Sequence, residues 1–160
     1  MIEAIENAAD AMLIDRLQPE HWEPAPSGAV RNAQPGFLLV AFESARDSVI
    51  GFVQVLEIDG VAHLEQLSVV PTYGRRGYGR KLIEDSMAEA GKRGYDELTV
   101  RTYADVPWNA PFYGTCGFTE TEPLTHFHRR LASLEKELGL DRYGRRIQMT
   151  VQLVAHRGLG

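Results

Sequence analysis

The loop over residues 74–80 carries the strongest chemical signal in the chain. Its members are Gly74, Arg75, Arg76, Gly77, Tyr78, Gly79 and Arg80. An apolar run from His63 to Val70 precedes the loop, and Lys81 to Arg93 follows it with apolar residues at helical spacing. The first N–H groups of a helix lack intrahelical partners, and the helix dipole favours an anion beside them. Glycines allow close approach to the backbone, and arginine forks suit phosphate oxygens, so the loop predicts a phosphate-binding site.

Other phosphate loops fit this stretch less well. A Walker loop ends in Gly-Lys-Ser or Gly-Lys-Thr, and the chain contains neither. The dinucleotide-binding fingerprint is G-x-G-x-x-G, whereas the glycines here stand in the opposite order, Gly74-x-x-Gly77-x-Gly79. For the loop considered alone, a plain glycine-rich turn before a helix remains the structural alternative.

A second segment, residues 109–118, reads Asn-Ala-Pro-Phe-Tyr-Gly-Thr-Cys-Gly-Phe. Together the two segments resemble the Gcn5-related N-acetyltransferase (GNAT) family. The family's pyrophosphate loop reads Arg/Gln-x-x-Gly-x-Gly/Ala, and its late helix commonly reads Asn…Ala-x-x-Phe-Tyr-x-x-x-Gly-Phe. Gly74 stands where the family has Arg or Gln, and Arg75 or Arg76 could supply the missing charge. The resemblance extends over most of the chain and is weakest at the N-terminus.

The pattern and the resemblance together imply an α/β fold, a mixed and mostly antiparallel central sheet with helices on both faces. We expect strands at residues 37–42, 49–58, 61–70, 96–103, 118–121 and 147–154. We expect helices at 81–93, 109–116 and 126–138, the last being an insertion on the common family plan. The N-terminus predicts a short strand at 2–5 and then a helix capped by Asn7 or Asp10, followed by a mostly irregular stretch over 18–36. The whole chain, 1–160, is expected to form one domain.

The resemblance implies acetyl-CoA as the acyl donor and an amine as the acceptor. In the family the pantetheine arm lies beside the central strand like an added strand, and the loop binds the pyrophosphate. The residues implied for cofactor binding are Leu67, Ser68, Val69, Arg75, Arg76, Gly77, Tyr78, Gly79, Arg80, Asn109 and Tyr113. An ordinary paired strand is the alternative for residues 67–69. A non-catalytic acyl-CoA sensor is the alternative to an enzyme.

Acetyl transfer to an amine requires a neutral amine, a stabilised oxyanion and a proton for the departing thiolate. Tyr113 matches the family tyrosine that donates this proton, although it could instead pack in the core. His63 and Glu65 alternate along one strand and are the candidate bases. Glu65 is favoured because family members often carry an acidic base there, whereas His63 fits by its near-neutral pKa. An ion pair of Glu65 with Arg101 is the structural alternative.

The composition argues against several classes of partner. A net charge of −5 gives nucleic acid no electrostatic support and mildly favours a cationic amine as acceptor. Cys116 is the single cysteine, so no internal disulfide forms. The acidic N-terminus and the absence of a membrane-length apolar run predict a cytoplasmic protein without a membrane partner. The resemblance also allows a homodimer. His126 and His128 have the wrong spacing for zinc, so we expect surface histidines and no metal.

Overall fold

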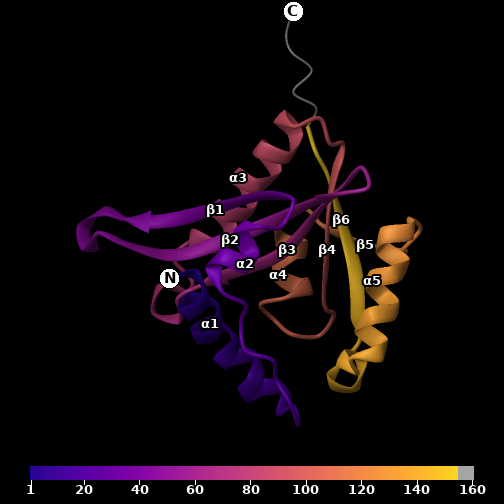
Figure 1. Ribbon diagram of the computed structural model, residues 1–160, viewed down its shortest axis with the longest axis horizontal. Coiled ribbons are helices and arrows are strands. Elements are labelled where there is room, and N and C mark those ends of the chain that lie inside the picture. Colours follow the sequence, from indigo (N-terminus) through magenta and orange to yellow (C-terminus); the bar gives the residue numbers. More distant parts are fainter. Residues whose placement is uncertain (155–160) are drawn as a thin grey trace, which may run out of the picture. The chain divides into compact units, whose positions relative to one another are not determined.

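The computed structural model describes residues 1–154 (Figure 1). The helices are α1 (Ile2–Leu17), α2 (Gly28–Asn32), α3 (Tyr78–Lys92), α4 (Ala110–Thr115) and α5 (His126–Glu137). The strands are β1 (Gly36–Glu43), β2 (Ser48–Ile58), β3 (Val61–Val69), β4 (Glu97–Tyr103), β5 (Thr119–Thr121) and β6 (Arg146–Gln152). Three short 3₁₀ turns are η1 (Ser44–Arg46), η2 (Pro71–Tyr73) and η3 (Leu140–Tyr143).

Within these residues the strands form one six-stranded sheet in the order β1-β2-β3-β4-β6-β5. The pairs β1–β2, β4–β6 and β5–β6 are antiparallel, and β3–β4 is parallel. The predicted mixed, mostly antiparallel α/β fold is therefore confirmed. The parallel pair follows from the crossover through α3, since a strand–helix–strand connection returns the chain in the same direction.

The chain groups into two compact units, and each is described by itself. Unit 1 contains residues 1–56 and 65–86, and unit 2 contains residues 57–64 and everything from 87 onward. The prediction of one domain over 1–160 stays a prediction, and its final stretch, 155–160, lies outside the described residues.

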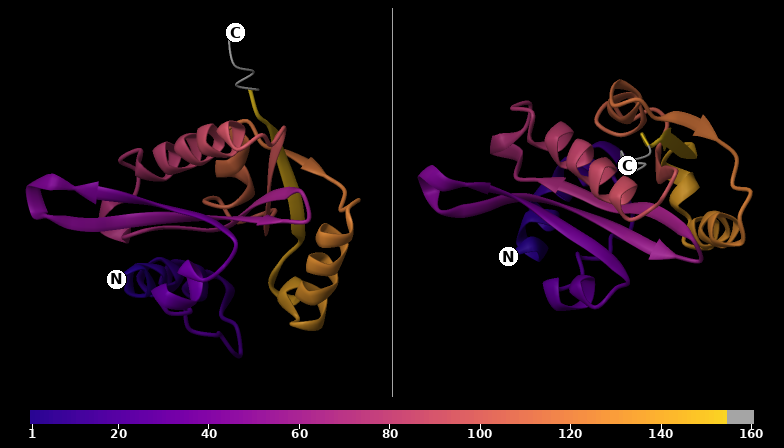
Figure 2. Two further views of the ribbon diagram at one scale, coloured as in Figure 1. Left: turned by 45° about the horizontal axis from the view of Figure 1, so that its top comes forward. Right: turned by 90° about the horizontal axis from the view of Figure 1, so that it is seen from above.

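Unit 1 is built on the β1–β2 hairpin, whose strand β2 is buried on both faces. Phe52 and Val53, at successive positions, are each 0% exposed. Figure 2 shows the start of α3 on one face of the hairpin and α1 with α2 on the other. The contacts agree, because Gly51 lies against Leu82 of α3, whereas Gln54 is hydrogen-bonded to Arg31 of α2. Burial on both faces explains the nearly continuous apolar sequence of β2.

The N-terminal predictions were partly wrong. No strand forms at residues 2–5, since α1 already begins at Ile2, and neither Asn7 nor Asp10 caps it. Asn7 instead accepts a hydrogen bond from the backbone N–H of Ala25 (2.9 Å). The supposedly irregular stretch contains the short helix α2, whose N-cap Ser27 accepts from the N–H of Val30 (3.2 Å). The bond between Asn7 and Ala25 is a tertiary contact, and such contacts outweigh the local strand preference of the first residues.

Unit 2 is built on the β4–β6 ladder, which runs from Glu97↔Gln152 to Tyr103↔Arg146. Alternate residues of a strand face opposite sides, so the apolar Leu98 and Val100 share one face while Thr99 and Arg101 share the other. The side chain of Thr99 meets α5, and α4 packs against β6. No helix among residues 1–154 is long and apolar enough to cross a membrane.

Candidate functional site

The glycine-arginine loop lies in unit 1 between β3 and α3. Pro71 opens the turn η2, and the N–H of Gly74 closes it by donating to the carbonyl of Pro71 (3.0 Å). Helix α3 begins at Tyr78, and the N–H of Lys81 donates to the carbonyl of Gly77 (3.0 Å) as the first helical hydrogen bond. The N–H groups of that first turn have no carbonyl of their own helix to bind, which makes them donors for an anion.

The loop backbone adopts conformations that L residues rarely take. Arg75 has a φ of 62° and Gly77 a φ of 86°, both in the left-handed region. For Arg75 this costs about 1–2 kcal/mol, and such strain persists only where its surroundings impose it. A Cβ placed on Gly77 would meet no atom within 4 Å. Glycine is thus required here by its φ rather than by crowding, and the space beside the backbone is open.

The ring of Tyr73 positions the loop arginine Arg76. Its guanidinium lies over the ring of Tyr73, 5.2 Å from the centroid, and Arg46 lies over the same ring at 5.8 Å. Tyr73 also meets the ring of Tyr78 edge-on at 6.0 Å. A hydrogen bond to Glu43 raises the pKa of Tyr73, so its phenol stays neutral. Stacking therefore positions one of the two charges expected to replace the family's first loop residue.

The predicted pantetheine strand, residues 67–69, is fixed from the side of β2. Ser68 is 2% exposed, and its Oγ accepts a hydrogen bond from Nε2 of Gln66 (3.0 Å). The N–H of Val70 donates to the carbonyl of Ile50 (2.8 Å). Gly51 lies so close to the carbonyl oxygen of Ser68 that an added Cβ would stand 2.9 Å from it. The strand thus enters the loop from a position set by its neighbour.

Tyr113, the predicted proton donor, lies in unit 2 on α4 and is 8% exposed. Its ring contacts the rings of Phe112 and Phe118. Burial raises the pKa of Tyr113 well above the usual phenol range, and the nearby thiol of Cys116 raises it further. The hydroxyl is therefore protonated throughout the neutral range, as a proton donor must be.

His63, one candidate base, is 2% exposed and belongs to a buried chain of hydrogen bonds. Its Nδ1 lies 2.8 Å from Oγ1 of Thr99, which lies 2.9 Å from Nε2 of His128. His128 Nδ1 in turn lies 2.7 Å from Oγ1 of Thr125. Burial, with the charges of His128, Arg101 and Arg146, lowers the pKa of His63 to about 3. The ring is neutral at pH 7, but so low a pKa makes it a weak base.

The predicted surface position is correct for His126, which is exposed, and wrong for His128, which is 3% exposed. Sequence reasoning missed His128 because the rotation of α5 on the sheet decides which of its residues is buried. The sequence did contain one signal, because Thr125 is a favourable N-cap residue and His128 follows it by three positions. In the structure the Thr125 hydroxyl accepts a hydrogen bond from the N–H of His128 (3.1 Å). Among residues 1–154, no group of three His, Cys, Asp or Glu side chains could hold a metal ion.

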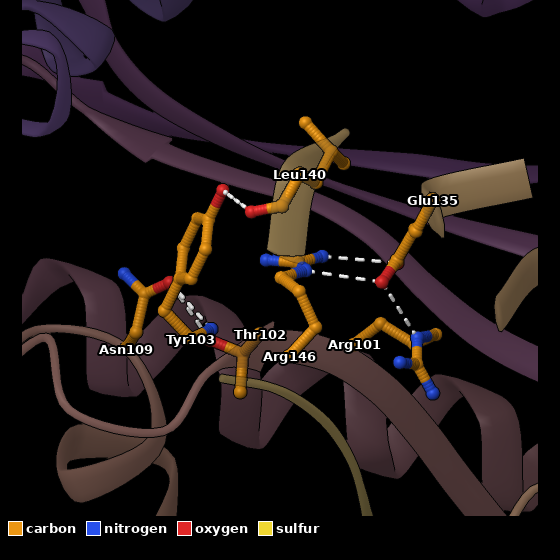
Figure 3. Close-up of polar contacts among 7 residues, drawn as sticks. All are labelled: Arg101, Thr102, Tyr103, Asn109, Glu135, Leu140 and Arg146. Carbon is orange, nitrogen blue, oxygen red and sulfur yellow. Dashed lines mark hydrogen bonds and ion pairs between the residues drawn. The ribbon is translucent and has the colours of Figure 1, made fainter. Parts of the chain in front are cut away.

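Glu65, the other candidate base, is exposed and belongs to unit 1. Arg101, its proposed structural partner, forms an ion pair with Glu135 of α5 at 3.0 Å, an acid that sequence reasoning did not consider. Asn109 precedes α4, and its Oδ1 accepts hydrogen bonds from Oγ1 of Thr102 (2.8 Å) and the N–H of Tyr103 (3.3 Å) (Figure 3). The amide oxygen of Asn109 therefore ties the end of β4 to the start of α4.

The predicted site residues are distributed over both units. Leu67 to Val69 and the loop residues 75–80 lie together in unit 1, along with Glu65. His63, Asn109 and Tyr113 belong to unit 2.

A mixed sheet in which a central strand leads through a glycine-arginine loop into a helix defines the class of acyl-CoA N-acyltransferase folds. Residues 5–118 match the family described as the acetyltransferase (GNAT) family, and the chain belongs to this family. The match ends at Phe118, before the helix α5 that the sequence marked as an insertion.

Solved structures share the fold at low sequence identity. The PaiA N-acetyltransferase from Thermoplasma acidophilum in complex with coenzyme A is 20% identical, with a TM-score of 0.54 over 72% of this chain and 60% of that one. A putative streptothricin acetyltransferase from Bacillus anthracis in complex with acetyl coenzyme A is 20% identical, with a TM-score of 0.60 over 77% and 65%. The ribosomal-protein-S18-alanine N-acetyltransferase from Escherichia coli is 21% identical, with a TM-score of 0.60 over 94% and 92%. This chain thus spans less than two thirds of the first two proteins.

Proposed function

We propose that this protein is an acetyl-CoA-dependent N-acetyltransferase that acetylates a primary amine of a small molecule or protein. The observation that carries the proposal is the loop, where Arg75 and Gly77 take left-handed conformations immediately before the first turn of α3. The same fold is found in proteins crystallised with coenzyme A or acetyl coenzyme A. Membership of the acetyltransferase family supports the same donor.

The proposed reaction is a direct transfer in a ternary complex. The neutral amine nitrogen attacks the thioester carbonyl carbon, the C–S bond then breaks, and CoA leaves as a thiol after receiving a proton. Loop residues 75–80 bind the pyrophosphate, and the backbone of Leu67, Ser68 and Val69 binds the pantetheine arm. Tyr113 supplies the proton, for which its protonated state at neutral pH is a prerequisite. Asn109 is a further candidate for contact with the arm through its amide nitrogen.

We favour Glu65 over His63 as the base that accepts the amine proton. Glu65 is exposed and so can reach substrate or an intervening water. His63 is buried, and its pKa of about 3 leaves little affinity for a proton at neutral pH. Replacing Glu65 with Gln should depress acetylation most at low pH, where less free amine is present. An unchanged pH–rate profile would remove Glu65 from this role.

Calorimetric titration with acetyl-CoA, and separately with CoA, tests the donor. We expect saturable binding that Gly77→Glu abolishes, because a carboxylate at the loop repels the pyrophosphate. Gly60→Glu is the matched control, since Gly60 also has a left-handed φ (77°) and open space around its Cβ position but lies in the β2–β3 turn. Loss of binding in both variants, or no binding by the wild type, would refute the proposal.

Thiol release with a panel of primary amines then separates the enzyme from a non-catalytic acyl-CoA sensor. Turnover of any one amine, at a rate that Tyr113→Phe lowers, would support the enzyme. Tight acetyl-CoA binding without turnover across polyamines, aminoglycosides and peptide N-termini would favour the sensor.

A further inference from the structure

A cavity of about 350 Å³ lies wholly within unit 2, among α5, η3, β4 and β6. Its charged lining consists of Arg101, Lys136, Arg145, Arg146, Glu135 and Asp141. Four of these side chains are cationic and two are anionic, although the whole chain has a net charge of −5. The cavity is thus a locally positive spot on an acidic protein.

The buried wall of the cavity has more positive than negative charge. Glu135 accepts two hydrogen bonds from Arg146, from Nε and from Nη2, each at 3.0 Å. Nε of Arg101 lies 3.0 Å from the same carboxylate, and the side chains of Arg101 and Glu135 are each 9% exposed. One carboxylate therefore neutralises two guanidinium groups incompletely, and an uncompensated buried charge is costly.

Arg101 is the incompletely bound member of this group. Its Nε is buried and makes no hydrogen bond within residues 1–154, so its contact with Glu135 is an ion pair only. Figure 3 shows the terminal nitrogens of Arg101 on the side of the guanidinium away from Glu135. The other two arginines of the lining are engaged. Arg146 is bound to Glu135 and stacked on Tyr103 at 4.5 Å, and Arg145 is paired with Glu120.

We propose that this cavity binds a small molecule carrying a carboxylate, which accepts hydrogen bonds from the guanidinium of Arg101. A planar carboxylate matches the fork of a guanidinium and would compensate the excess charge beside Glu135. Lys136, on the exposed side of α5, adds a second cation at the rim. The volume is at the small end of the range of about 300–1,000 Å³ typical of ligand pockets. All residues of the lining belong to unit 2, and carboxylate binding there is independent of acetyl-CoA chemistry.

The test is a titration of the acetyl-CoA-free protein with succinate at constant ionic strength, followed by ¹H–¹⁵N spectra of the arginine Nε groups. We expect saturable binding with a shift of the Arg101 signal. Arg101→Gln removes the fork but leaves the Glu135–Arg146 pair intact, and should weaken succinate roughly tenfold or more. Arg130→Gln is the matched control, because Arg130 is exposed on α5, does not line the cavity, and loses the same charge.

Two further titrations make the test decisive. Succinamide, which lacks the charges of succinate, should not bind. Lys136→Gln should weaken succinate binding, and this variant can be measured even if Arg101→Gln fails to fold. The proposal is overturned if succinate does not saturate, if both arginine variants weaken it equally, or if inorganic phosphate binds while succinate does not. None of these readouts requires acetyl transfer, so failure here is separate from failure of the proposed enzyme activity.

Discussion

Gly51 of β2 and Ser68 of β3 approach so closely that a Cβ on Gly51 would lie 2.9 Å from the Ser68 carbonyl oxygen. The Cβ could not move aside, since it would also stand 3.2 Å from the side chain of Val69 and 3.3 Å from that of Leu82. The strand that leads into the loop is therefore positioned by the absence of a side chain on its neighbour.

Gly51→Ala should push β3 away from β2 and destabilise the protein by about 1–3 kcal/mol, the usual cost of overpacking. It should also weaken CoA binding, because Ser68 belongs to the stretch proposed to bind the pantetheine arm. Urea denaturation and CoA titration measure the two effects. Gly114→Ala is the control, as its Cβ position is empty and alanine favours a helix. Equal stability of both variants would contradict the prediction.

Substitutions in the Arg101–Glu135–Arg146 group should have unequal effects on stability. Glu135→Gln leaves two largely buried guanidinium groups, with side chains 9% and 15% exposed, without a carboxylate, and should cost about 3–5 kcal/mol. Arg101→Gln leaves Glu135 fully bound by Arg146, so its cost should be much smaller. Chemical denaturation of both variants measures the difference. Similar losses in the two would show that the pair with Arg146 is not the stabilising contact.

The buried His63 should make the protein less stable in acid. Its pKa is about 3 in the folded state, against about 6.5 for a solvated histidine. As the pH falls between these values the unfolded chain takes up a proton that the folded chain does not, so stability is fully present above this window and is lost within it.

His63→Asn should therefore flatten the pH dependence of the unfolding free energy between about pH 6.5 and pH 3. His126→Asn is the control, because His126 is exposed and should leave the slope unchanged. A slope in His63→Asn as steep as that of the wild type would assign the acid sensitivity to other groups.

Tyr113→Phe should lower kcat by about 100-fold or more if the hydroxyl protonates the leaving thiolate. The KM for acetyl-CoA should change little, since the ring and its packing on Phe118 are retained. Tyr103→Phe is the matched control, because it removes a hydroxyl that donates to the carbonyl of Leu140 (2.9 Å). A kcat that falls equally in both variants would indicate a general structural effect.

The sequence predicted the parts of the fold that depend on local pattern. The apolar strand β2, the helix α3 after its glycine loop, and the strand β6 were all identified by periodicity within a few residues of their bounds. The loop itself was recognised from its glycines and arginines, and of its three glycines only Gly77 has a left-handed φ.

The errors arose where distant residues decide the local structure. Helix α1 replaces a predicted strand because Glu6 forms a buried ion pair with Arg31 (2.7 Å), a residue of another helix. Glu135 was overlooked as the partner of Arg101 because α5 and β4 are far apart in sequence. His128 became buried through contacts that its own helix pattern does not reveal.

The hydrogen bonds from His63 and His128 to the hydroxyl of Thr99 constrain both rings at once. A threonine hydroxyl has a single proton, so it cannot donate to Nδ1 of His63 and to Nε2 of His128 together. At least one imidazole must place its own proton toward Thr99, and the tautomers of the two histidines are coupled. When His128 accepts the Thr99 proton at Nε2, His63 must donate to Thr99 from Nδ1, so one tautomer of a residue on α5 restricts the tautomer of a residue on β3.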